Sequence, residues 1–167
     1  LRVMAGCATP VLGMSSFLWS NLLSEPKQYN MTDSSNSVIE EYAHSYRIVE
    51  EEREGDSNQY HYEGPMGRIK TFENPDKARL YADVHTVTGG FREEKTGERG
   101  APPAVAQSRE DVLMAYYAAQ PTMSMQWVAA QFDLPEDRVR EYVRSLRTRA
   151  EQQRADDDQD SLSSESS

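Results

Sequence analysis

The chain has one cysteine, four lysines and no long apolar run, and each scarcity excludes a class of protein. Cys7 alone allows neither an internal disulfide nor a thiolate metal cluster. His44, His61 and His85 lack the spacing that histidine metal ligands share. No stretch of eighteen apolar residues occurs, which argues against a transmembrane helix. We therefore expect no metal, no cofactor and no membrane partner.

Acidic side chains outnumber basic ones, with 28 Asp and Glu against 18 Lys and Arg and a formal net charge of −10. Such a composition is typical either of partial disorder or of a halophilic proteome, whose proteins carry acidic surfaces. We favour the halophilic interpretation, because the acids also run through the patterned segments. In molar salt the screening length falls to about 3 Å, so acidity argues less strongly against DNA as a partner. We expect a cytoplasmic protein.

The chain divides into five predicted segments. Residues 1–37 are expected to be a disordered or upstream-translated leader, with Met31 as the true start. Residues 38–90 are expected to form a small α+β region, and residues 91–107 a loop or linker rich in Gly and Pro. Residues 108–150 are expected to form a helix-turn-helix domain, followed by a disordered acidic tail over residues 151–167.

Within residues 38–90, periodicity and turn signals predict three elements. The stretch "VIEEYAHSYRIV" over residues 38–49 has apolar residues at helical spacing. Two extended segments, near residues 60–62 and 68–72, flank a Gly-Pro-x-Gly turn and predict a hairpin. A helix is predicted to follow Asn74 as N-cap and Pro75 as its first residue. The predicted fold class is mainly α, with a C-terminal tri-helical unit.

The stretch "SMQWVAAQFDLPEDRVREYVRSL", residues 124–146, meets the steric demands of a helix-turn-helix at fixed offsets. A small residue is needed where the two helices touch, and a residue that tolerates the left-handed conformation is needed in the turn. Ser124 suits the N-cap of one helix, and Pro135 suits the start of the next. The predicted motif residues are Val128, Ala129, Phe132, Asp133, Leu134, Val139 and Tyr142.

The segment "SREDVLMAYYAAQ" upstream predicts the further helix that such a unit needs to enclose a core. With the pieces "TGERGAPPAVAQ", "DVLMAYYAAQP", "SMQWVAAQF" and "VREYVRSLRTRA", the chain resembles small haloarchaeal proteins with a C-terminal helix-turn-helix, and more distantly the fourth region of sigma factors. The resemblance covers roughly residues 91–150 and implies a DNA-binding protein of a halophilic archaeon. The acids Glu136 and Asp137 depart from the usual pattern of such readers.

In the docking geometry that the resemblance implies, the last helix enters the major groove of double-stranded DNA. Arginine can bridge guanine O6 and N7, and glutamate can accept a hydrogen bond from cytosine N4. The alternative is an exposed helix face whose arginines pair with nearby acids. The predicted DNA-contacting residues are Gln126, Glu136, Asp137, Arg138, Arg140, Glu141, Arg144 and Arg147.

Two functions stay open at this point. The first is a sequence-specific DNA-binding protein that regulates transcription. Its expected partners are double-stranded DNA and a second copy of the chain. The second is a protein-interaction or dimerisation module that does not bind DNA. Burial of Trp127 and Tyr117 would favour the first, and an exposed patch the second. An enzyme is not expected, because His61 with Glu63 and Asp83 with His85 show no nucleophile or metal ligand beside them.

Overall fold

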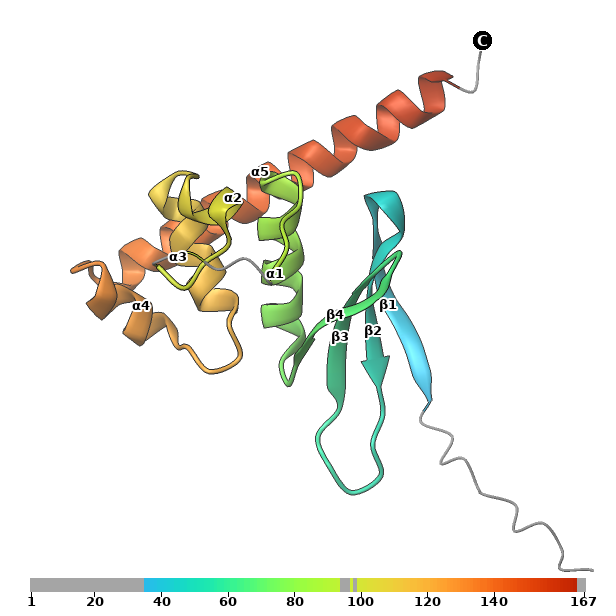
Figure 1. Cartoon of the computed structure of the whole chain (residues 1–167), viewed down its shortest axis with the longest axis horizontal. Helices are drawn as coiled ribbons and strands as arrows, with labels where there is room; N and C mark the ends of the chain where they lie inside the picture. The colour runs from blue at the N-terminus through green and yellow to red at the C-terminus, as the bar shows by residue number, and fades with distance from the viewer. Residues whose placement is uncertain (1–34, 94–96, 98, 165–167) are drawn as a thin grey trace, which may run out of the picture. The chain divides into compact units, whose positions relative to one another are not determined.

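A computed structural model describes residues 35–93, 97 and 99–164. The predicted leader over residues 1–37 lies outside these residues, apart from its last three. The described chain belongs to one unit of contacts that begins at Ser34. It contains a four-stranded sheet followed by five α-helices (Figure 1).

The sheet is an antiparallel meander in which each strand pairs with the next along the chain. Its strands are β1 (Asn36–Tyr42), β2 (Tyr46–Glu51), β3 (Gln59–Gly64) and β4 (Gly67–Phe72). The predicted β3–β4 hairpin is confirmed, with Gly64 opposite Gly67 at the turn. Gly67 has a φ of 115°, a conformation that only glycine adopts without strain.

The helix predicted over residues 38–49 is wrong, and with it the mainly α fold class. These residues form β1 and β2, which face each other with Val38 opposite Val49 and Glu40 opposite Ile48. Between them, His44 and Ser45 take left-handed φ values of 59° and 62°, which reverse the chain. The spacing of the apolar residues fits both the period of a helix and that of a strand. Because β2 pairs with β3, which lies outside this segment, the strands are favoured.

The helices are α1 (Pro75–Val87), α2 (Pro103–Ala106), α3 (Glu110–Ala119), α4 (Met125–Gln131) and α5 (Glu136–Ser164). The predicted start of α1 is confirmed, because the Asn74 side chain accepts a hydrogen bond of 2.8 Å from the backbone N–H of Asp76. Asn74 thereby satisfies one of the free N–H groups of the first turn.

The separate tri-helical unit predicted for residues 108–150 is also wrong, because α1 packs against α3 and α5 on one side and against the sheet on the other (Figure 1). Leu80, Tyr81 and Val84 of α1 are all buried. They belong to one continuous core that joins Ile48 of the sheet to Leu146 of α5. A helix that is apolar on two sides needs cover on both, and α1 therefore merges the two predicted regions.

The predicted loop over residues 91–107 is anchored to this core by Glu93. Its carboxylate accepts hydrogen bonds from Lys70 Nζ at 2.9 Å, Tyr81 OH at 2.8 Å and Tyr116 OH at 2.9 Å. Burial alone would raise the pKa of Glu93, but these three donors hold it below its usual value. Buried Val105 of α2 adds an apolar anchor farther along the loop.

In place of the predicted disordered tail, α5 continues as a helix through residues 151–164. Arg154 supports this extension, because its guanidinium donates a hydrogen bond of 2.7 Å to Asp83 of α1. The same guanidinium lies 5.4 Å from the ring centre of Tyr42 on β1. These contacts come from parts of the chain far from the tail, so the composition of the tail alone could not indicate them.

Candidate nucleic-acid interface

A short turn joins α4 to α5 and sets the angle between them. Ser124 caps α4 by accepting a hydrogen bond of 3.1 Å from the N–H of Trp127. Asp133 takes a φ of 53°, as predicted for this position of the turn. The chain then closes through a backbone hydrogen bond of 3.0 Å from Leu134 to Ala129.

The predicted motif residues divide by burial in the way that a helix contact requires. Ala129 is buried where α4 packs against α5, and a small side chain there allows the two helices to approach. Val128 and Val139 are buried with it, whereas Phe132, Leu134 and Tyr142 are half-buried against the same core. Asp133 is exposed, and it contributes to the turn through its left-handed backbone rather than through packing.

The first three turns of α5 present a polar face to solvent. On this outward face, Glu136 is half-buried, and the exposed residues are Asp137, Arg138, Arg140, Glu141 and Arg144. Gln126 is exposed on α4 nearby in sequence. Glu136 and Asp137 stand in the first turn of the helix, where the helix dipole favours negative charge.

The arginines of the outward face divide into two paired and one unpaired. Arg140 pairs with Glu136 one turn before it, and Arg138 pairs with Glu141 at 2.6 Å. Arg138 also lies 5.5 Å from the ring centre of Tyr142. Among the described residues, the guanidinium of Arg144 has no ion-pair partner. The face thus carries three arginines and three carboxylates, whose charges cancel.

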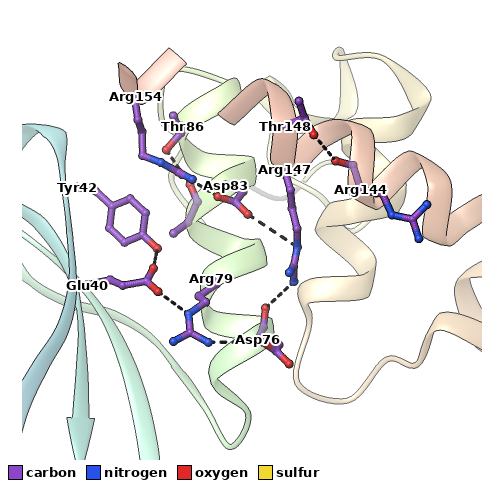
Figure 2. A network of polar contacts seen from close by, with 11 residues as sticks. Glu40, Tyr42, Asp76, Arg79, Asp83, Thr86, Arg144, Arg147, Thr148 and Arg154 are labelled. Atoms are coloured by element: carbon purple, nitrogen blue, oxygen red, sulfur yellow. Dashed lines mark hydrogen bonds and ion pairs between the residues drawn. The ribbon is translucent and has the colours of Figure 1, made fainter. Parts of the chain in front are cut away.

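Arg147 does not belong to this face, although the sequence placed it among the DNA-contacting residues. Its guanidinium lies 4.0 Å from the Asp83 carboxylate and donates a 3.3 Å hydrogen bond to the Asp76 carbonyl (Figure 2). Arg149 likewise turns inward and binds Asp111 at 2.7 Å. The basic stretch that suggested DNA binding is therefore shared between the surface and the interior.

Asp83 is the acidic centre of the inward contacts. Its side chain is only 7% exposed and receives both Arg154, at 2.7 Å, and Arg147. Burial raises the pKa of Asp83, while the two guanidinium groups act in the opposite direction. The sequence suggested Asp83 only as a partner of His85, because nothing local to it shows that α5 would lie alongside.

Tyr117 and Trp127, whose burial was expected to distinguish the two functions, differ in exposure. Tyr117 is buried at 8% exposure, whereas Trp127 is 42% exposed. The two rings meet edge to face, with centroids 5.8 Å apart. Both line a surface hollow of about 530 Å³ that also includes Phe132. The core thus contains one of the pair and leaves the other at the surface.

A polar cluster that sequence reasoning missed lies on the sheet. His61 is fully buried, with Nδ1 2.9 Å from Thr71 Oγ1 and Nε2 2.7 Å from Glu51 Oε2. Hydrogen bonding to His61 holds the pKa of Glu51 below its usual value. The hairpin register places Thr71 opposite His61, but only the β2–β3 pairing brings Glu51 near. Glu63, two residues from His61 in the sequence, binds Arg47 at 3.0 Å instead of His61.

Within the described residues, no group of three or more His, Cys, Asp or Glu side chains could hold a metal ion. No helix in this part of the chain is long and apolar enough to cross a membrane.

Comparison with known proteins adds no relative. No family model, no curated protein and no solved structure matches this chain.

Proposed function

We propose that this protein binds double-stranded DNA in a sequence-specific manner and regulates transcription. The contact surface is the outward face of the first three turns of α5, with Gln126 of α4 beside the DNA backbone. One observation carries the proposal. No described part of the chain covers this face, although the later part of the same helix is pinned to α1.

The α4–turn–α5 geometry supports the proposal, because it presents an exposed helix end beside a shorter packed helix. In DNA readers with this arrangement, the second helix lies in the major groove and its N-terminal residues meet the base edges. Arg140 and Arg144 lie one helical turn apart, so Arg140 can meet a base edge while Arg144 meets a backbone phosphate. Glu136 and Glu141 suit cytosine, because each carboxylate can accept a hydrogen bond from the amino group of that base.

The ion pairs on the face do not prevent such contacts. A pair between exposed side chains contributes about 0–1 kcal/mol, so Arg140 can exchange Glu136 for a guanine at little cost. Because the charges of the face cancel, few counterions are released on binding. We therefore expect a shallow dependence of affinity on salt, which suits a protein that works at high salt.

The test is fluorescence anisotropy at several salt concentrations, with a duplex selected from genomic fragments and a scrambled duplex. Arg140→Ala should weaken binding to the selected duplex by about 1–3 kcal/mol and relax preference at one base pair. Arg144→Ala should weaken binding to both duplexes alike and lower the salt slope by about one. Arg53→Ala, on an exposed arginine of the β2–β3 loop, is the matched control and should leave binding unchanged.

Two results would contradict the proposal. One is wild-type protein that binds neither duplex at any salt concentration. The other is an Arg140→Ala, Arg144→Ala double variant that binds both duplexes as tightly as wild type does.

The acid excess of the whole chain extends the proposal to the setting of the protein. We propose that it works in the cytoplasm of a halophilic archaeon, where an acidic surface keeps a protein hydrated in molar salt. Unfolding curves in 0.2 M and 3 M potassium chloride test this point. Equal stability in the two salts would contradict it.

The second candidate function, a dimerisation module, is favoured by the exposure of Trp127. An aromatic ring beside a surface hollow is typical of protein contacts. Sedimentation equilibrium of wild type and of Trp127→Ser tests this candidate. A wild-type dimer that dissociates in the variant would support it, and a wild-type monomer at all concentrations would exclude a homodimer.

A further inference from the structure

A second surface feature lies away from the outward face of α5. It is a partly open cavity of about 210 Å³ between the β1–β2 hairpin, the C-terminal end of α1 and residues 153–157 of α5. Tyr42, Tyr46 and Tyr62 are among the residues that line it. Tyr46 and Tyr62 stack nearly parallel, at an interplanar angle of 10° and a centroid distance of 5.7 Å. Flat walls of this kind favour a planar molecule.

Two polar groups in the wall lack partners. The His85 side chain is only 7% exposed and is packed among rings, with the Tyr46 centroid 4.6 Å away. Tyr62 as a whole residue is 1% exposed. Within the described part of the chain, no protein group forms a hydrogen bond with its hydroxyl or with the ring nitrogens of His85. These atoms are not among the fully buried unpaired atoms of the described residues, and both side chains line the cavity, where a ligand can replace water as their partner.

The hairpin at the rim of the cavity is held in an unusual conformation. His44, which lines the cavity, and Ser45 next to it both take left-handed φ values. Consecutive non-glycine residues in this region are strained, and such strain gathers at ligand-binding and switching sites. This observation is independent of the unpaired groups and points to the same place.

The charges around the cavity favour neither anions nor cations. Arg154 lines the wall, but its guanidinium is already bound to Asp83 at 2.7 Å, as Figure 2 shows. Asp157, one turn farther along α5, lines the same cavity. With one charge of each sign on its wall, the cavity has no net charge to attract an ion of either sign, and an uncharged ligand suits it.

We propose that this cavity binds an uncharged, planar heteroaromatic molecule of the nucleobase class. Such a ring stacks on the tyrosines and offers neighbouring donor and acceptor atoms along one edge. The Tyr62 hydroxyl donates to an acceptor of that edge, and the neutral His85 imidazole donates or accepts according to its tautomer. The cavity of about 210 Å³ has room for one planar ring system.

The experiment is isothermal titration calorimetry of the full chain with adenine, uracil, benzoate and benzylamine. Benzoate and benzylamine share the ring shape but carry opposite charges. Adenine or uracil should bind at one molecule per chain, and at least about tenfold more tightly than either charged ring. Adenosine and adenosine monophosphate are titrated in parallel. Comparison of their affinities with that of adenine shows whether the site prefers a free base, a nucleoside or a nucleotide.

Variants decide whether the binding belongs to this cavity. His85→Phe keeps an aromatic ring but removes both nitrogens, and Tyr46→Leu removes a stacking wall. Each should weaken binding by at least about tenfold, while circular dichroism and the melting temperature report whether the variant is folded. Tyr60→Leu is the matched control, because Tyr60 is another half-buried tyrosine of the sheet that lies outside the cavity.

Three results would overturn the proposal. The first is that neither base binds up to its solubility limit. The second is that a charged ring binds more tightly than both bases. The third is that folded His85→Phe and Tyr46→Leu bind the base as tightly as Tyr60→Leu does.

Discussion

In the first half of α5, Arg138 and Arg140 pair with carboxylates of their own helix at the surface. In the second half, taken to begin at Arg147, Arg147 and Arg154 instead reach Asp83 of α1, whose side chain is buried. The two halves follow one another without a break in the helix, and in the sequence their arginines look alike. What separates them is the neighbour that each half meets.

The difference assigns different tasks to the two halves. A surface pair contributes about 0–1 kcal/mol, so the first half can change partners and remains available for a ligand such as DNA. Removing one partner of a buried pair costs several kcal/mol, because the remaining charge is left without compensation in a poorly solvated place. The second half is therefore structural, and it holds the orientation of the first.

The largest loss of stability should come from replacing Asp83, the carboxylate that Arg147 and Arg154 of the second half share. Asp83→Asn keeps the shape of the side chain but leaves Arg154 and Arg147 without their carboxylate. Because Arg154 keeps some contact with water, we expect a loss of about 2–4 kcal/mol, toward the lower end of the range for buried pairs. Urea unfolding measures it, with exposed Asp137→Asn as control. Equal stability of the two variants would show that the halves do not differ.

The next largest loss of stability should come from the contact between α4 and α5 at Ala129, which positions the first half of α5. Ala129→Leu should cost about 1–3 kcal/mol, because the larger side chain has to separate α4 from α5. Ala130→Leu is the matched control, since Ala130 is exposed on the same helix. Thermal unfolding of both variants measures the difference. A silent Ala129→Leu would mean that α4 does not position α5.

A smaller effect is expected at the turn before α5. Asp133 holds a φ of 53°, which glycine adopts more easily. Asp133→Gly should therefore be neutral or stabilise by up to about 1 kcal/mol. Gln131→Gly, close by in α4, should instead destabilise by about 0.5–1 kcal/mol. Chemical denaturation of the two variants gives the sign, and a clear loss in Asp133→Gly would rule out the left-handed turn.

The smallest effect should come from the surface pair of the first half. Arg140→Ala should change the free energy of unfolding by less than about 0.5 kcal/mol, because the pair with Glu136 is exposed. Arg154→Ala on the same helix should cost several times more. Differential scanning calorimetry of both variants tests the ratio. Comparable losses would remove the distinction on which the proposed interface depends.

Signals that act over a few residues were predictable from the sequence. The Asn74 cap, the Gly-Pro-x-Gly hairpin, the Ser124 cap and the left-handed Asp133 all depend on groups within one turn of each other. The burial of Ala129 and Val139 follows from their spacing along the α4–α5 segment. Each of these features has a local physical cause, so the order of the residues contains the information.

Features that depend on distant partners were decided by the tertiary structure. Residues 38–49 have a pattern that suits a helix, but cross-strand hydrogen bonds to β3 make β2 a strand. The tail is acidic and polar, yet Asp83, 71 residues before Arg154, anchors the helix that continues into it. Arg147 and Arg140 are the same residue type in one basic stretch, and only the position of α1 sends the first inward. Strand pairing and buried ion pairs join groups far apart in the chain, so a local pattern cannot specify them.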